Sequence, residues 1–298
     1  MPGSLIATAE LVISGVAHLH LDSQGYLLEQ GATLNMTVTA FDNFGNEFDP
    51  DQYERMAFAL EIEMTGIHRT RGLLAAQVPG EHRVFSVTGV EPGNYVVTAY
   101  VDRSFLGTDS EHSARVTSEA NKLEVFPVLT LVPSTLLLTP NMRYTLRILG
   151  GPSRGSYGSS IEGSLVDIRF DIEDSRVASI DSLREITARE VGDTSLAYTI
   201  IQTKQARDGK EWRNIVSKRT LPIRVRLVTS IEIPSNQQRI VYSGSMLKQL
   251  AVLKHHNETF SHGVAPISWD WNCSHPGILR PHVPSDSDSS SSQLQHYL

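Results

Sequence analysis

Hydrophobic and polar residues alternate along most of this chain, and this period of two restricts its fold more than any other feature. In the segment TLNMTVTAFD (33–42), one face carries Leu34, Met36, Val38 and Ala40, and the other carries Asn35, Thr37 and Thr39. The segment LPIRVRLV (221–228) alternates in the same way. Such alternation indicates β-strands with one buried and one solvated face. We find no amphipathic helix longer than two turns.

Turn-forming residues separate these segments roughly every ten residues. They occur at Asn43–Asn46, Pro79-Gly80, Pro92-Gly93, Gly192-Asp193 and Asp208-Gly209. Short strands with regular turns predict an all-β sandwich. The chain has one cysteine, Cys273, so an intrachain disulfide and the antibody type of domain are excluded.

The strand pattern repeats along the chain. A shift of 110 residues superimposes the hydrophobic positions of segment 34–38 on those of 144–148, and those of 58–62 on those of 168–172. A further shift of 99 aligns IRFDIEDS with ISWDWNCS. A repeat of about 100 residues is typical of immunoglobulin-like domains.

The repeat predicts the domain organisation. We expect immunoglobulin-like sandwiches over residues 1–126 and 127–228, and an incomplete third domain over 229–284. Only three strands are evident in the third, near SIEIP, LKQLAVL and ISWDW, whereas a sandwich needs about seven. Residues 285–298 are rich in Ser and Asp and are predicted to be disordered. The chain therefore reads as a fragment or a truncated product.

The charge balance restricts the partners. The sequence has 26 basic and 33 acidic residues and a formal net charge of −7. We expect no nucleic-acid partner, because phosphate binding requires a basic patch. The N-terminus lacks the pattern of a signal peptide, and no apolar run approaches the roughly 18 residues that span a bilayer. No cofactor motif is evident.

The segment 151–155 matches G-x-S-x-G, the pattern of a hydrolase nucleophile elbow centred on Ser153. An elbow needs a strand before the serine and a helix after it, but GSYGSS is a poor helix start. A phosphate-binding loop would need G-K-[ST], and no lysine is present. The segment is therefore interpreted as a loop between strands.

Two clusters contain potential metal ligands. The first lies in HHNETFSH and consists of His255, His256, Glu258 and His262. The second consists of Asp42, Asn46, Asp49 and Asp51. Neither has the spacing of H-E-x-x-H or of an EF-hand loop, so we interpret both as solvated polar segments and predict no metal site.

Two further pairs also have structural interpretations. Trp269 and Trp271 lie on one face of a predicted strand, where core packing is more common than a carbohydrate-stacking platform. Arg224 and Arg226 lie on the solvated face of another strand and form no nucleic-acid stripe. No catalytic residues are predicted.

Three N-x-[ST] triplets begin at Asn35, Asn257 and Asn272 and are candidate N-glycosylation sites. Asn35 is expected on the outward face of its strand, where a glycan would fit. Several acceptors together with one free cysteine are compatible with the lumen of the secretory pathway.

The segment LEVFPVLTLVPSTLLLTPNMRYTLRILGGPS (123–153), with VDIRFDIEDSRVASID (166–181) after it, resembles the luminal repeats of the nuclear pore membrane glycoprotein 210 family. There a VFPPL-type entry leads to a strand ending in GGP. ISWDWNCSHPGIL resembles the next repeat, and AFDNFGNEFD resembles a recurring turn. Residues 127–228 are also similar to bacterial immunoglobulin-like group 2 domains, through RVASID and VGDTS.

The resemblance implies a structural constituent of the nuclear pore and no enzyme. The family member has a signal peptide, many luminal domains and one membrane span, so anchoring would depend on regions absent from this chain. The resemblance implies the perinuclear side of the envelope, and it implies homo-oligomerisation through luminal domains and contact with other pore membrane components. Self-association would use exposed edge strands or sandwich faces.

The alternative function is an adhesion or ligand-binding module of the bacterial group 2 type, which would recognise a surface ligand through loops at one end. A hydrolase that uses Ser153 is a third and more distant interpretation, which a Ser153→Ala variant would test.

Overall fold

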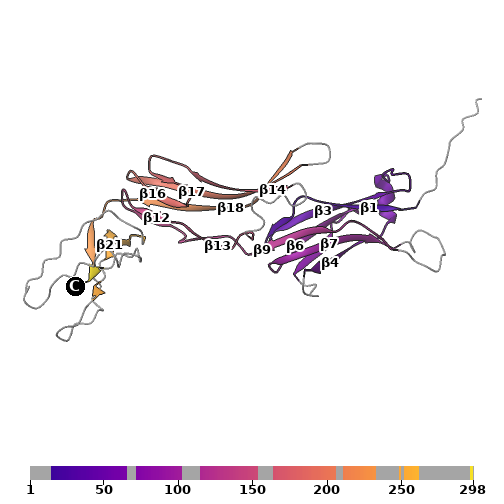
Figure 1. The fold of residues 1–298 in the computed structure, drawn as a ribbon, viewed down its shortest axis with the longest axis horizontal. Helices are drawn as coiled ribbons and strands as arrows, with labels where there is room; N and C mark the ends of the chain where they lie inside the picture. The colour runs from indigo at the N-terminus through magenta and orange to yellow at the C-terminus, as the bar shows by residue number, and fades with distance from the viewer. Residues whose placement is uncertain are drawn as a thin grey trace, which may run out of the picture. The chain divides into compact units, whose positions relative to one another are not determined.

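The computed structural model describes residues 15–65, 72–102, 115–153, 164–205, 211–232 and 252–261, with the strands at 248–249 and 296–297. Strands dominate these ranges (Figure 1), and the one helical segment in them is the 3-10 helix η1, Pro50–Arg55. The all-β prediction is therefore confirmed. Within the same ranges, no helix is long and apolar enough to cross a membrane.

The chain forms two compact units. The first contains residues 1–128, 150–166 and 202–216, and the second contains 129–149, 167–201 and 217–298.

The first unit is a sandwich of two sheets (Figure 1). One sheet has the order β1-β3-β6-β5, with strands β1 (His18–Ser23), β3 (Thr33–Phe41), β6 (Val84–Gly89) and β5 (Leu73–Gln77). The other has the order β2-β9-β7-β4, and β8 also pairs with β7. Its strands are β2 (Leu27–Glu29), β9 (Asn121–Phe126), β7 (Gly93–Val101), β4 (Phe58–Met64) and β8 (Val116–Thr117).

This strand order is that of an immunoglobulin-like domain. In the order in which they lie in the first sheet, β1, β3, β6 and β5 correspond to strands A, B, E and D. In the second sheet, β4, β7 and β9 correspond to strands C, F and G. The short strand β2 adds to the second sheet and runs parallel to β9. The fold class predicted from the alternation is therefore confirmed by topology.

The alternation of hydrophobic residues builds the core of this sandwich. On β3 the side chains of Leu34, Met36, Val38 and Ala40 are all buried, whereas Asn35 between them is exposed. Full burial of each large apolar side chain contributes about 2 kcal/mol. A slip of one residue in register would turn the whole apolar set toward solvent, so the pattern also fixes the strand pairing.

The second unit repeats the same order. β14 (Ser164–Ile172), β17 (Gly192–Gln205) and β18 (Glu211–Val225) form the C-F-G sheet, and β11 (Leu136–Leu138) runs parallel to β18. The opposite side contains β10 (Thr130–Val132), β12 (Arg143–Thr145), β13 (Arg147–Leu149), β16 (Glu185–Ala188) and β15 (Ala178–Ile180). β10 pairs with β13, and β12 pairs with β16, which pairs with β15.

Strand B of this sandwich is split into β12 and β13 at Leu146. The Leu146 side chain is buried, and its backbone N–H donates to the Arg184 carbonyl at 3.0 Å. Both segments detected by the 110-residue shift thus fall on equivalent strands, B (β3 and β12–β13) and C (β4 and β14). The aligned segment ISWDWNCS lies outside the described residues.

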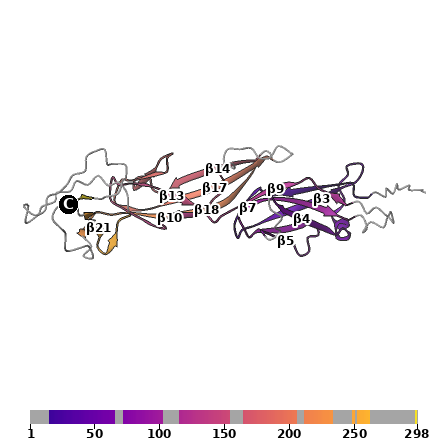
Figure 2. The same cartoon turned by 60° about the horizontal axis from the view of Figure 1, so that its bottom comes forward.

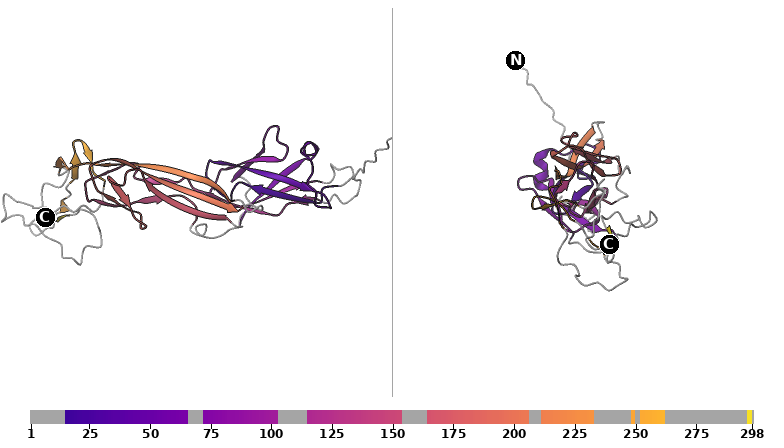
Figure 3. Two further views of the ribbon diagram at one scale, coloured as in Figure 1. Left: turned by 90° about the horizontal axis from the view of Figure 1, so that it is seen from above. Right: turned by 90° about the vertical axis from the view of Figure 1, so that its left-hand side faces the viewer.

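β17 and β18, with 14 and 15 residues, form a long hairpin (Figure 3). The division into units falls within both strands, so residues 202–205 and 211–216 belong to the first unit.

After Thr229, the strands β19 (Ser230–Glu232), β21 (Val252–His255) and β22 (Glu258–Thr259) form a small sheet. Leu253 and Phe260 are buried against Leu137, with Val228 packed beside them, whereas Ile231 is 55% exposed.

β20 (Lys248–Gln249) pairs with β23 (His296–Tyr297). β23 falls within the range 285–298, for which the sequence predicts disorder, and the other residues of that range lie outside the described ones.

Candidate functional site

The G-x-S-x-G segment begins at the turn that follows β13. Gly150 and Gly151 have φ values of 74° and 86°, which favour glycine. A Cβ at Gly150 would collide with the carbonyl oxygen of Val128, and the Gly151 N–H donates to the Pro127 carbonyl at 3.1 Å. The Ser153 N–H donates to Glu124 Oε1 at 2.6 Å. The two glycines therefore serve a close approach of two backbone segments, and the residues after Ser153 lie outside the described ones until Ser164.

The predicted Asp42 cluster is a hydrogen-bonded turn between β3 and η1. Asp42 Oδ1 accepts the N–H groups of Phe44 and Asn46, each at 2.8 Å, and Oδ2 accepts the Asn46 amide at 3.1 Å. Desolvation opposes ionisation, but the hydrogen bonds from Asn46, Phe44 and Gly45 outweigh it and lower the pKa of Asp42. At the start of η1, the Asp49 backbone N–H donates to Gln52 Oε1 at 2.8 Å. The carboxylate thus organises a turn.

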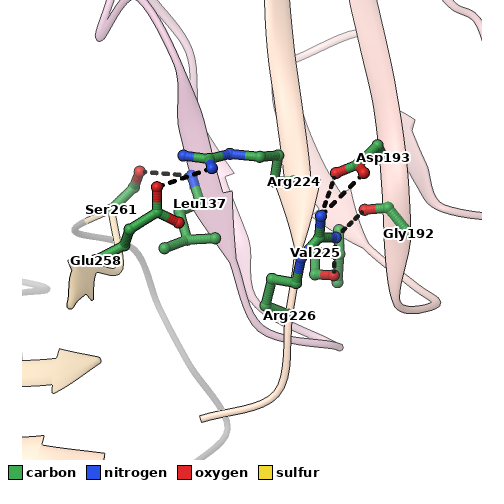
Figure 4. Close-up of polar contacts among 8 residues, drawn as sticks. All are labelled: Leu137, Gly192, Asp193, Arg224, Val225, Arg226, Glu258 and Ser261. Carbon is green, nitrogen blue, oxygen red and sulfur yellow. Dashed lines mark hydrogen bonds and ion pairs between the residues drawn. The ribbon is translucent and has the colours of Figure 1, made fainter. Parts of the chain in front are cut away.

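The histidine cluster is part of the β21–β22 hairpin. His255 Nδ1 lies 2.8 Å from the Leu227 carbonyl, and its ring lies 4.4 Å from the His256 ring, edge to face. Glu258 forms an ion pair with Arg224 at 2.8 Å (Figure 4). His262 lies outside the described residues. Among the described residues, no group of three His, Cys, Asp or Glu side chains is placed to hold a metal.

The two arginines of β18 and its extension are both paired. Arg226 Nη2 donates to both carboxylate oxygens of Asp193, at 2.7 and 2.9 Å, and Nη1 donates to the Gly192 carbonyl at 3.0 Å (Figure 4). Arg224 meets Glu258 from the neighbouring hairpin. These pairs link strands of the second unit, which accounts for both guanidinium groups.

The glycosylation candidates differ in how far the structure describes them. Asn35 is exposed on β3, as its alternation predicts, and lies opposite Ser86 of β6. Asn257 is exposed in the two-residue turn between β21 and β22. Asn272 lies outside the described residues, as do Trp269, Trp271 and Cys273. Glycan attachment itself stays a prediction.

Some buried polar groups were not foreseen from the sequence. The Gln202 side chain is fully buried against Gly25, and neither its amide nitrogen nor its amide oxygen has a hydrogen-bond partner. The hydroxyls of Tyr26 and Ser217 are likewise buried without a partner. Burial, and secondarily the charge of Glu124, raises the pKa of Tyr26. Nothing in a strand sequence marks a glutamine as buried, so no signal could have identified Gln202.

The sheet edges are the remaining surfaces where a structural protein would bind a partner. On β1, the Leu21 carbonyl accepts the Asn121 amide at 2.6 Å, and the Ser23 carbonyl accepts Lys204 Nζ at 3.1 Å. Side chains therefore occupy polar groups along that edge. β2 and β10 have three residues each, which is short for a pairing template.

The β11 edge is covered by the C-terminal hairpin. The Leu137 N–H donates to Ser261 Oγ at 3.1 Å, and the Ser261 N–H donates to the Leu137 carbonyl at 2.8 Å (Figure 4). Both backbone groups that Leu137 turns away from β18 are thus satisfied.

Charges occupy two other edges. β4 carries Glu61 and Glu63, both exposed, and β14 carries Asp167, Arg169 and Asp171. Charged side chains on an edge strand discourage pairing with another chain.

β5, at the margin of the first sandwich (Figure 2), differs from these edges. Its sequence is LLAAQ, and Leu74, Ala75, Ala76 and Gln77 are all exposed, with Leu74 at 63%. Of the described edge strands with five or more residues, it alone has no ionisable side chain. No motif in the sequence marks this strand.

No protein-family model matches the chain. Among solved structures, the bacterial integrin-binding protein invasin matches with a TM-score of 0.41 and 10% identity, over 75% of this chain and 42% of invasin. The S-layer protein rSbsC matches with a TM-score of 0.26 and 13% identity, over 96% of this chain and 36% of that protein. The Escherichia coli adhesin FdeC matches with a TM-score of 0.29 and 11% identity, over 72% of this chain and 66% of FdeC.

This chain spans less than half the length of invasin and of rSbsC. These matches identify no family, and the immunoglobulin-like fold follows from the strand order of the two sandwiches.

Proposed function

We propose that this chain is a non-catalytic structural segment that associates with copies of itself, as its resemblance to the nuclear pore membrane glycoproteins implies. The observation that supports the proposal is the contact between the two motifs that carry the resemblance. The entry stretch 125–129 and the GGP stretch 150–152 meet through the Gly151–Pro127 hydrogen bond and the close approach of Gly150 to Val128. The two motifs thus form one structural feature, and Ser153 belongs to it.

The same proposal includes the site of action. As part of a longer protein, the segment would lie on the perinuclear side of the nuclear envelope, with other pore membrane components as further partners. In that location Asn35 would be an accessible glycan acceptor, because it is exposed on β3 and a glycan attached there would project from the sheet into solvent.

Sedimentation equilibrium of the chain over a wide concentration range tests self-association. We expect a reversible monomer–oligomer equilibrium whose average mass rises with concentration. A mass that stays at 32.9 kDa at every concentration would contradict the proposal. For localisation, the chain placed behind a signal sequence and before a membrane span should enrich at the nuclear rim, and uniform endoplasmic reticulum labelling would count against it.

A second candidate function is an adhesion module, which one exposed side chain favours. Phe44 is 76% exposed at the turn after β3, and Asp42 fixes its backbone N–H at 2.8 Å. A rigid, exposed aromatic residue on a turn is typical of binding loops. If this function holds, Phe44→Ser should remove binding of the chain to a cell or matrix surface while sedimentation stays unchanged. The structural proposal predicts no such binding.

A further inference from the structure

We infer that the outer edge of β5 is the self-association surface, and that it pairs in antiparallel fashion with β5 of a second copy of this chain. The inference rests on the proposed function and names the surface that would carry it.

The backbone of β5 has groups available for such pairing. The Val90 N–H donates to the Gly72 carbonyl at 2.8 Å, and the Val78 N–H donates to the Val84 carbonyl at 2.9 Å. In the observed register these are bonded pairs, and bonded and non-bonded pairs alternate in an antiparallel ladder. Leu73, Ala75 and Gln77 therefore direct their N–H and C=O groups away from β6. No described strand pairs with that side.

For pairing with a second copy, the charge pattern favours β5 over the charged edge strand β4. The chain has a net charge of −7, so its copies repel one another in general. An antiparallel pair of β4 strands would bring Glu61 close to Glu63 of the other copy, and like charges on opposing strands are destabilising. An antiparallel pair of β5 strands would bring no charged side chains together, because β5 has none. Its exposed Leu74 and small Ala76 lie on one face of the strand, with Thr88 and Ser86 of β6 as cross-strand neighbours.

The register follows from symmetry. Two identical antiparallel strands are related by a two-fold axis, and the pairing that uses all five residues places Ala75 opposite Ala75 of the other copy. Leu74 then lies opposite Ala76, so a large side chain meets a small one at both positions. The outward groups of Leu73, Ala75 and Gln77 would supply the hydrogen bonds.

The size of the strand predicts a weak contact. A single pair of five-residue strands buries less than the roughly 1,000 Å² expected of a stable interface. We therefore expect dimerisation only at high concentration in this chain, and tighter association where several repeats act together.

Cysteine cross-linking tests the register in the full chain with Cys273→Ser in every variant. Ala75→Cys places the two sulfurs at a pair whose Cα atoms would lie about 5.5 Å apart, within the range of a disulfide. Ala76→Cys is the matched control, because its two Cα atoms would lie about 8 Å apart. Under mild oxidation we expect the Ala75→Cys chain to give at least about fivefold more covalent dimer. Equal yields, or a higher yield from Ala76→Cys, would overturn the inference.

Ala75→Pro provides a second measurement. It removes an outward N–H that no described group uses, so proline is tolerated there while the pairing loses its central donor. We expect at least about tenfold weaker association by sedimentation, with an unchanged melting temperature. If Ala75→Pro associates as well as the unmodified chain, the β5 inference fails and self-association stands. If the unmodified chain stays monomeric, the proposed function fails as well.

Discussion

The two sandwiches share one strand order, but they differ in the edge strand at position D. β5 and β15 both occupy position D, next to β6 and β16. β5 has five uncharged residues with four exposed in succession. β15 has three residues and lies between charged turns, with Asp174 and Arg176 before it and Asp181 after it.

This difference shows that the core residues and the edge strands of a sandwich are under separate structural requirements. The inward faces must be apolar in both sandwiches, because the alternation determines which residues are buried. The edges are not restricted in that way, so one can be short and flanked by charge while the other stays open. Among the described long edge strands the others are covered or charged, so the open β5 edge is the one available to a partner.

The largest expected effect tests whether the cores are equivalent. Val97 and Leu196 each lie four residues after the glycine that opens strand F, and both are fully buried. Leu196→Ala should lower the free energy of unfolding by about 3 kcal/mol and Val97→Ala by about 2 kcal/mol, through lost burial and the cavity left behind. Urea denaturation measures both.

Leu74→Ala is the control for the core variants. Leu74 is 63% exposed, so its truncation should change the free energy of unfolding by less than about 0.5 kcal/mol. A cost near that of Leu196→Ala would mean that β5 is not an open edge, and the contrast between β5 and β15 would be lost.

A second effect tests the turn that contains the family-like motif. Gly150→Ala adds a Cβ that collides with the Val128 carbonyl oxygen at a positive φ. Gly31→Ala is matched to it, because Gly31 has φ +85° but open space around its Cβ position. We expect about 2 kcal/mol of destabilisation for Gly150→Ala and about 1 kcal/mol for Gly31→Ala. Equal destabilisation by the two substitutions in thermal denaturation would show that the close approach of Gly150 to Val128 does not contribute to stability.

Much of this fold could be read from the sequence. Period-two alternation gave the strand faces, including the exposure of Asn35, and the repeat gave the equivalence of β4 and β14. Local patterns could not give the break of strand B at Leu146, because there the strand changes its partner from β16 to β10, and both partners are distant in the sequence.

Neither the covered edge nor the open one could be foreseen from the sequence. Ser261 covers Leu137 across 124 residues, and no motif records that distance. On β5, alternation predicts that every second residue is buried, yet Ala75 is exposed although it shares a face with buried Val87. Exposure there depends on where the sheet ends, which only the topology shows.

A third, smaller effect concerns the covered edge. Ser261→Ala removes the hydroxyl that accepts the Leu137 N–H and keeps the backbone bond in the other direction. We expect about 1 kcal/mol of destabilisation, measured by denaturation, because the Leu137 N–H loses its partner. Hydrogen exchange of the Leu137 amide should also accelerate relative to that of Leu138. Unchanged exchange would show that the hairpin does not protect this edge.

The smallest effect concerns the charged turn before β15. Hydrogen bonds from the Arg176 side chain and backbone lower the pKa of Asp174, against a smaller opposing effect of desolvation. A carboxyl whose folded pKa lies below its unfolded value adds stability above the unfolded value of 3.8 and loses it as the pH falls through the folded pKa. Asp174→Asn should therefore be destabilising at neutral pH, with a difference from the unmodified chain that shrinks below pH 3.8. The turn is exposed, so the effect should be small. Carboxyl titration by NMR gives the same pKa directly, and a value at or above 3.8 would show that Arg176 does not anchor this turn.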